Sequence, residues 1–159
     1  MNRIPAKNRL PLLALVILAL QACSGGPFDP GQGRAELRAA RARWERQGIS
    51  DYRYTIIKAC GECMPESVAP ARVEVRGGRT VSVEALFDAR PIRREFFDAY
   101  DTVEDLFAVI EATLAENPYR FHASYDRRRG HPLSYSVDYD RQMVDDEGGF
   151  TVADFEIIQ

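Results

Sequence analysis

The sequence predicts an α+β fold: a mainly antiparallel sheet of about five to six strands with two helices packed on one face. Two observations lead to this prediction. Segments with strand character outnumber those with helical character, and no β-α-β alternation recurs along the chain. The helices and strands therefore belong to one α+β domain, which we place at residues 34–159.

The first 22 residues have the pattern of a bacterial export signal. Arg3, Lys7 and Arg9 precede a nearly continuous apolar run over residues 10–20, which is too short to span a membrane comfortably. We therefore interpret residues 1–22 as a signal peptide that is removed from the mature protein.

The residues after the apolar run indicate a lipid anchor. Leu20-Gln21-Ala22 leads directly into Cys23, an order that resembles the bacterial lipobox. The resemblance implies that Cys23 is acylated, with palmitate-like chains, and becomes the first mature residue held by membrane lipid. The alternative is an ordinary signal peptide cut elsewhere, with Cys23 as a free thiol. Ser24, where aspartate would favour inner-membrane retention, points to the outer membrane, facing the periplasm of the bacterial envelope.

The composition after cleavage describes an acidic chain long enough for one domain. Removing 22 of 159 residues leaves 137, and the loss of three positive charges takes the formal charge from −3 to −6. This acidity argues against a general nucleic-acid binder. Residues 23–33 are rich in glycine and proline, so we expect a flexible tether there.

The first helix is expected over residues 34–47. This stretch contains no glycine or proline and is rich in alanine, arginine and glutamate, with Gly48 as a C-terminal stop. Leu37, Ala40 and Trp44 form one apolar stripe at helical spacing. We interpret Trp44 as the anchor of this helix in the core rather than as a platform for a ligand.

Three strands follow the first helix. Alternation from Tyr52 predicts the first strand, and residues 72–75 and 80–83 are two short strands joined by Gly77-Gly78, a strong hairpin signal. Residues 86–101 mix aromatic, basic and acidic side chains, and we expect a long loop with short turns that covers part of the sheet.

A second helix and three more strands complete the domain. Thr102 and Asp105 form a variant of the capping box, the apolar positions after Thr102 recur at helical spacing, and Asn117-Pro118 ends the helix. The remaining strands are predicted at residues 119–125, 133–139 and 150–158.

Cys60 and Cys63 form a C-x-x-C pair whose spacing suits three kinds of site. A structural disulfide is the default in an exported protein, and with Cys23 acylated these are the only two thiols left. A redox pair would place the first cysteine at a helix N-terminus, whereas Cys60 follows a strand, and nearby prolines discourage a helix directly after the pair. A metal site would need two more ligands, for which His122 and His131 are the available histidines.

Two charged stretches in the C-terminal half are expected to be solvated. The acidic residues 138–147 fail the spacing of a calcium-binding EF-hand loop, so we expect a loop between strands with Gly148-Gly149 as its turn. A glycosidase-like carboxylate pair could be present there, although spacing alone does not show it. Arg127-Arg128-Arg129 is expected at a hairpin tip, with contact to anionic lipid or an acidic partner as the alternative.

Several of these features recur together over nearly the whole mature chain. They are Trp44 before Asp51-Tyr52-Arg53-Tyr54, the cysteine pair, the Gly77-Gly78 hairpin, residues 102–107, Tyr125-Asp126 with Gly130-His131-Pro132, and Asp145-Asp146-Glu147. The set is similar to a family of small bacterial lipoproteins known as a domain of unknown function, DUF6174. The resemblance implies a secreted α+β domain and brings no established activity, so it supplies no catalytic residues.

The functional prediction follows from a complete export signal beside missing catalytic signatures. The chain has no Ser-His-Asp or Cys-His pattern and no phosphate-binding glycine loop. We expect a non-catalytic, lipid-anchored module that binds an unknown periplasmic protein partner without a cofactor or metal. The candidate binding residues are Tyr125, Asp126, Arg128 and His131. The alternatives are a thiol–disulfide oxidoreductase that uses Cys60 and Cys63, or a metal-binding module.

Overall fold

The computed structural model describes residues 28–87, 92–143 and 145–159. The predicted signal peptide, Cys23 and the first part of the predicted tether lie outside these ranges. Within them, no helix is long and apolar enough to cross a membrane.

A six-stranded sheet forms the body of the molecule, and all its neighbouring strands are antiparallel. The strand order is β3-β2-β1-β6-β5-β4. The strands are β1 (Tyr52–Cys60), β2 (Ala71–Arg76), β3 (Arg79–Ala85), β4 (Arg120–Tyr125), β5 (Pro132–Asp138) and β6 (Gly148–Ile157). The predicted α+β class is confirmed.

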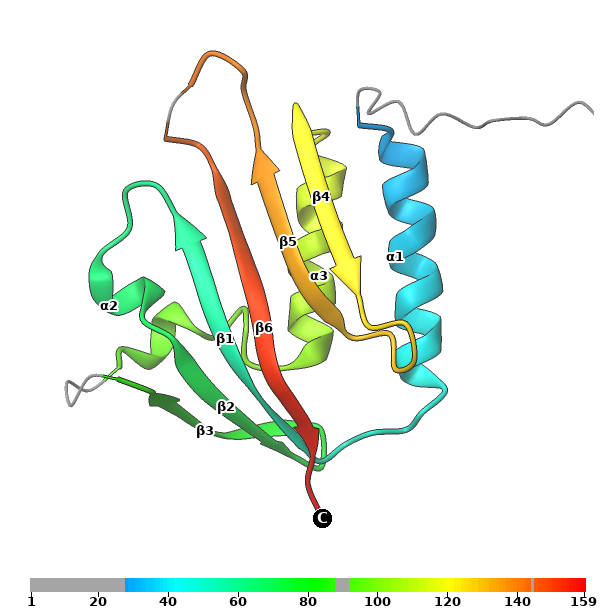
Figure 1. Ribbon diagram of the computed structural model, residues 1–159, viewed down its shortest axis with the longest axis vertical. Helices are drawn as coiled ribbons and strands as arrows, with labels where there is room; N and C mark the ends of the chain where they lie inside the picture. Colours follow the sequence, from blue (N-terminus) through cyan, green and yellow to red (C-terminus); the bar gives the residue numbers. More distant parts are fainter. Residues whose placement is uncertain (1–27, 88–91, 144) are drawn as a thin grey trace, which may run out of the picture.

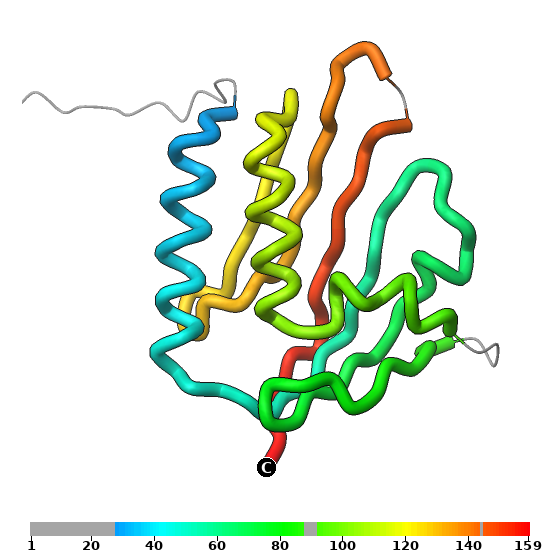
Figure 2. Tube along the Cα trace, turned by 180° about the vertical axis from the view of Figure 1, so that it is seen from behind, coloured from blue at the N-terminus to red at the C-terminus, as the bar shows by residue number. Residues whose placement is uncertain are grey.

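The helices cover one face of this sheet. The two long helices are α1 (Pro30–Glu45) and α3 (Val103–Ala115), and the short ones are α2 (Pro65–Val68) and a 3-10 turn at Arg94–Phe96. Figures 1 and 2 show α1 and α3 side by side over the β4 and β5 half, while the segment before α3 crosses the β1 and β2 half. The opposite face of the sheet carries no helix in these views.

The core lies between this sheet face and the helices. In β1, Tyr52, Tyr54 and Ile56 are fully buried, whereas Ile57 points to the other face and is 39% exposed. This alternation is the period of two that a half-buried strand requires. The remaining core is supplied by the apolar stripes of α1 and α3, as expected from their spacing: Leu37, Ala40, Trp44, Val103, Leu106, Phe107, Ile110 and Leu114.

Helix α1 begins at Pro30, four residues before the start predicted from composition, so the last four residues of the predicted tether are helical. Asp29 caps the helix by accepting a hydrogen bond from the Gly31 N–H at 2.8 Å, and Pro30 occupies the first turn, where proline is favoured. Gly33 is buried so closely against Leu114 that a Cβ atom would approach it to 3.0 Å. A local cap and tertiary packing thus extend the helix.

Helix α3 has the predicted N-cap and fastens α1 to the sheet. The Thr102 side chain accepts a hydrogen bond from the Asp105 N–H. Glu104 accepts a bond from the Trp44 indole N–H at 2.9 Å, and the Val103 N–H donates to the Tyr52 hydroxyl at 2.9 Å. Burial raises the pKa of Tyr52. The first turn of α3 therefore connects α1 and β1.

Two local predictions were wrong. Gly148 and Gly149 begin β6 instead of forming a turn, because Gly149 lies so close to Tyr135 of β5 that a Cβ atom would sit 2.3 Å from its carbonyl oxygen. A one-turn helix, α2, follows the cysteines at once, since Pro65 occupies the first helical turn, where its missing N–H costs no hydrogen bond.

Candidate functional site

An open groove lies at the end of the sheet where β1 and β5 finish and β4 and β6 begin. Its volume is about 970 Å³, which suits a small ligand or a short chain segment. Its walls include Phe28, Ala59, Cys60, Gly61, Tyr119, Arg120, Phe121, His122, Ser136, Val137, Asp138, Glu147 and Gly148. Figure 1 shows that α1 also begins at this end. We call this cavity the end groove.

The end groove combines aromatic and charged walls. The rings of Phe28 and Phe121 lie 5.2 Å apart and supply apolar surface. Arg120 and Asp138 form an ion pair across β4 and β5, with 3.8 Å between the Arg120 Nη1 and Asp138 Oδ2 atoms. The other carboxylate oxygen of Asp138 is buried and has no hydrogen-bond partner within the described parts of the chain. The Asp138 side chain is 18% exposed through its other atoms, so its outer oxygen is the acceptor that the groove offers to a ligand with a donor.

Cys60 and Cys63 form a disulfide beside the end groove. Their sulfur atoms are at bonding distance, 2.00 Å, and their Cα atoms are 5.5 Å apart. Cys60 ends β1 and Cys63 precedes α2, so the bond closes a short loop at the groove wall. Within the described residues, no group of three or more histidine, cysteine or acidic side chains is placed to hold a metal ion.

Three of the four candidate binding residues from the sequence belong to the opposite end of the sheet, in the loop between β4 and β5. The Asp126 carboxylate accepts hydrogen bonds from the backbone N–H groups of Arg128, at 3.0 Å, and Arg129. Burial favours the protonated acid, but these donors outweigh it and hold the pKa of Asp126 below its usual value. Asp126 therefore builds the turn, while the Arg128 side chain is exposed.

His131 lies in the core rather than on a binding surface. It is 2% exposed, stacks on Phe155 at 4.0 Å between ring centroids and meets the edge of Trp44 at 6.1 Å. Neither ring nitrogen has a hydrogen-bond partner among the described residues. Burial lowers its pKa to about 4, which nearby Asp126 partly opposes. The ring is enclosed as a neutral group.

Tyr125 is the one candidate of the four that lines a described groove, a smaller cavity between β4 and α1. Its ring stacks on Phe107 at 6.3 Å, and burial raises the pKa of its hydroxyl. The four candidates therefore have different surroundings and do not form one site. The end groove was not predicted, because its walls come from residues scattered over the sequence that meet only when the strands align.

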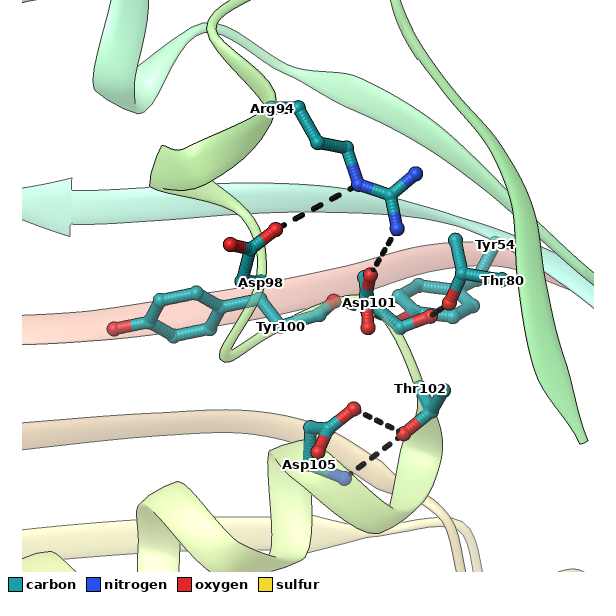
Figure 3. Close-up of polar contacts among 8 residues, drawn as sticks. All are labelled: Tyr54, Thr80, Arg94, Asp98, Tyr100, Asp101, Thr102 and Asp105. Carbon is teal, nitrogen blue, oxygen red and sulfur yellow. Dashed lines mark hydrogen bonds and ion pairs between the residues drawn. The ribbon is translucent and has the colours of Figure 1, made fainter.

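A polar cluster also missed from the sequence fastens the segment before α3 to the sheet (Figure 3). Arg94 pairs with Asp101 at 2.6 Å, the Thr80 hydroxyl donates to the Asp101 carbonyl at 2.6 Å, and the Tyr54 hydroxyl donates to the Tyr100 carbonyl at 2.7 Å. Burial raises the pKa of Asp101, and Arg94 partly opposes this shift. These groups satisfy one another, so the cluster has a structural role.

Lys58 is a further unpredicted feature. Its amine donates to the Phe96 carbonyl and lies 4.2 Å and 5.0 Å from the ring centroids of Phe97 and Tyr100. Partial burial lowers the pKa of Lys58 to about 8. The amine is held by a carbonyl and two aromatic faces, which is the arrangement of a cation–π contact in a protein interior.

The fold and the groove define a small α+β domain with one helix-covered sheet face and an open cavity at one end. The chain belongs to the family of unknown function DUF6174, whose family model matches residues 36–157. Comparison with the curated proteins and with the solved structures found no match.

Proposed function

We propose that this protein is a non-catalytic, lipid-anchored protein of the bacterial envelope that binds a ligand in the end groove. One observation carries the proposal: the groove of about 970 Å³ has aromatic walls and the partly exposed carboxylate of Asp138, one oxygen of which has no donor among the described residues. The ligand that fits has an apolar surface and at least one hydrogen-bond donor, because a buried acceptor left unpaired is costly.

The position of the groove relative to the anchor supports this function. Phe28 lines the groove and lies only five positions after Cys23 in the sequence. A fully extended chain spans at most about 3.6 Å per residue, so acylation at Cys23 would hold Phe28 within about 18 Å of the membrane surface. We propose that the protein is anchored at the periplasmic face of the outer membrane. This location would bring the groove close to membrane-associated ligands.

The disulfide supports binding over redox catalysis. A reactive cysteine of a C-x-x-C pair usually lies at a helix N-terminus, where its thiolate is stabilised. Cys60 instead ends a β-strand, and the disulfide closes the loop that forms part of the groove wall. We therefore assign the cysteines a structural role in shaping the groove.

Site-specific photocrosslinking in intact cells tests the proposal. A photoreactive amino acid at Ser136, an exposed residue of the groove, should give a discrete adduct that mass spectrometry can identify. The same amino acid at Arg79, an exposed residue at the start of β3, is the matched control and should give none. Equal labelling from both positions, or no adduct from Ser136, would contradict the groove as a binding site.

A second arm tests the anchor. Metabolic labelling with an alkyne analogue of palmitate should mark the wild-type protein and not Cys23→Ala. If the ligand is membrane-associated, Cys23→Ala should also lose the adduct from Ser136 while its purified domain keeps the same unfolding temperature. Palmitate labelling that persists in Cys23→Ala would contradict the proposed anchor.

A further inference from the structure

Strand β4 is at the edge of the sheet and has one unpaired side. It pairs with β5 from Arg120 to Tyr125, and the strand order places no described strand beyond it. The N–H and C=O groups on the outer side of an edge strand are a template for the addition of another extended chain. An edge of this kind can bind a specific partner where a groove runs beside it.

Such a groove lies between β4 and α1, with a volume of about 540 Å³. Its β4 wall contains Ala123, Ser124 and Tyr125, and its α1 wall contains residues three and four positions apart, which share one helix face. The middle of that face consists of alanines, Ala39 and Ala40, so the helix leaves room beside the strand. We call this cavity the edge groove. It shares no lining residue with the end groove.

The edge groove has positive charge from both walls. Arg43 of α1 and Arg127 of the β4–β5 loop line it, and neither forms an ion pair with a described residue. Glu36, two turns before Arg43 on the same face of α1, lines the groove as well. The groove therefore presents two guanidinium groups that have no ion-pair partner among the described residues, and one carboxylate that accepts a hydrogen bond from Gln32.

The loop that carries Arg127 is held against α1. The Gln47 side chain donates to the Arg128 carbonyl at 3.0 Å, and Gly130 lies so close to α1 that a Cβ atom would come within 2.3 Å of the Ala40 carbonyl oxygen. Two backbone N–H groups bonded to Asp126 fix the turn itself. The backbone that carries the two arginines is thus positioned before any partner arrives, which reduces the entropy that binding must overcome.

We propose that an extended, acidic peptide segment of a partner protein binds in the edge groove by adding a strand to β4. Backbone hydrogen bonds to the free side of β4 would supply affinity. Carboxylates of the segment would pair with Arg43 and Arg127, because guanidinium groups bind carboxylates through paired, charge-assisted hydrogen bonds. A peptide fits this edge better than a lipid surface does, because only an extended chain can continue the backbone hydrogen-bond ladder of β4.

Fluorescence anisotropy with a short labelled peptide of alternating valine and glutamate tests this inference on the acylated full-length protein in detergent. The peptide should bind, whereas the same sequence with lysine for glutamate should not. A version with methylated backbone nitrogens should also fail, because it cannot donate hydrogen bonds to β4. Loss of binding only in these two peptides supports strand addition with recognition of acidic side chains.

Variants place the binding in the edge groove. Arg43→Ala and Arg127→Ala should each weaken binding about tenfold or more, the loss expected for one charge-assisted contact. Arg38→Ala, an exposed arginine on α1 outside the groove, is the matched control and should bind normally. Ala39→Trp should block binding, because Ala39 is exposed and its replacement fills the groove without entering the core. Circular dichroism should show that all four variants are folded.

Three results would overturn the inference: no binding of the glutamate peptide, equal binding of the methylated peptide, or binding that ignores Arg43→Ala and Arg127→Ala. A fourth would reassign the arginines to lipid, namely protection of the β4–β5 loop from hydrogen exchange only in phosphatidylglycerol vesicles without peptide binding. Each result is independent of adduct formation from Ser136, so failure here leaves the end groove untouched.

Discussion

The two ends of the sheet differ in the charged side chains that gather there: acidic residues at one end and arginines at the other. At the end where α1 begins, acidic residues gather between β5 and β6: Asp138, Asp140, Asp145, Asp146 and Glu147. At the other end, arginines gather on the last turns of α1 and on the β4–β5 loop: Arg43, Arg46, Arg127, Arg128 and Arg129. Figure 1 shows the acidic loop and the β4–β5 loop at opposite ends of the strands.

Packing differs between these ends as well. The arginine-rich end is closed by stacked rings, in which Trp44, Tyr52 and His131 surround Phe155. The acidic end contains the open groove and a disulfide. The local motif Gly130-His131-Pro132, which the sequence shows directly, thus belongs to the closely packed end. The end groove forms where the ends of several strands meet, and no local sequence motif marks it.

The largest expected effect is the pH dependence caused by His131. The ring is enclosed as a neutral group, and its folded pKa of about 4 lies below the usual value of 6.5. Below pH 6.5 the unfolded chain binds a proton that the folded chain does not, so the free energy of unfolding falls as pH drops from 6.5 to 4. The loss should reach about 3 kcal/mol, because each pKa unit corresponds to about 1.4 kcal/mol.

Urea unfolding at a series of pH values measures this loss. His131→Phe should keep the stack on Phe155 and flatten the profile between pH 6.5 and 4 relative to wild type. His122 is exposed on β4, so His122→Phe is the matched control and should reproduce the wild-type slope. A wild-type slope that survives in His131→Phe would show that carboxyl groups, and not this histidine, govern the acid sensitivity.

A smaller effect is expected from replacing two glycines that both have positive φ but different surroundings. Gly130 has φ +96° and faces the α1 backbone, whereas Gly78 has φ +72° in the β2–β3 turn with nothing within 4 Å of a built Cβ atom. Gly130→Ala should lower the free energy of unfolding by about 2 to 3 kcal/mol, through both backbone strain and displacement of the β4–β5 loop.

Gly78→Ala should lower the free energy of unfolding by only about 1 kcal/mol, because backbone strain is its one cost. Thermal and urea unfolding of both variants give the comparison. Equal losses would mean that the β4–β5 loop moves away from α1 at little cost, and would weaken the case for a rigid edge groove. The expected difference would be evidence that α1 and the loop are held together.

Much of the fold follows from patterns that a sequence shows directly. The alternation of Tyr52, Tyr54 and Ile56 predicts a half-buried strand, and Gly77-Gly78 predicts the turn between β2 and β3, because both signals are local. The cap at Thr102 is local too. The predicted turn at Gly148-Gly149 failed because it depended on a distant contact: Gly149 has the character of a turn residue until its close approach to Tyr135 is known.

The candidate sites were less predictable than the fold. The disulfide between Cys60 and Cys63 was one of three interpretations of their spacing, and the structure shows the bond. His131 and Asp126 were among the candidate binding residues, yet one is enclosed and the other holds a turn. The sequence could not show that Arg43 and Arg127 line the same groove, since only the packing of α1 beside β4 brings them together.

The most local expected effect on stability comes from the disulfide at the acidic end. The bond closes a loop with only two residues between the cysteines, so it removes little freedom from the unfolded chain. Replacing both Cys60 and Cys63 by serine should lower the free energy of unfolding by less than about 2 kcal/mol. Reduction of the wild-type protein should have the same effect.

The double replacement should affect only the acidic end of the sheet and leave the arginine-rich end unchanged. Amide hydrogen exchange should speed up from Cys60 to Val68 and at the start of β6, because the loop forms one wall of the end groove. Exchange in α1 and in the β4–β5 loop should stay as in wild type. If exchange rises equally at both ends, the disulfide supports the whole domain, and the end groove is not an independently shaped site.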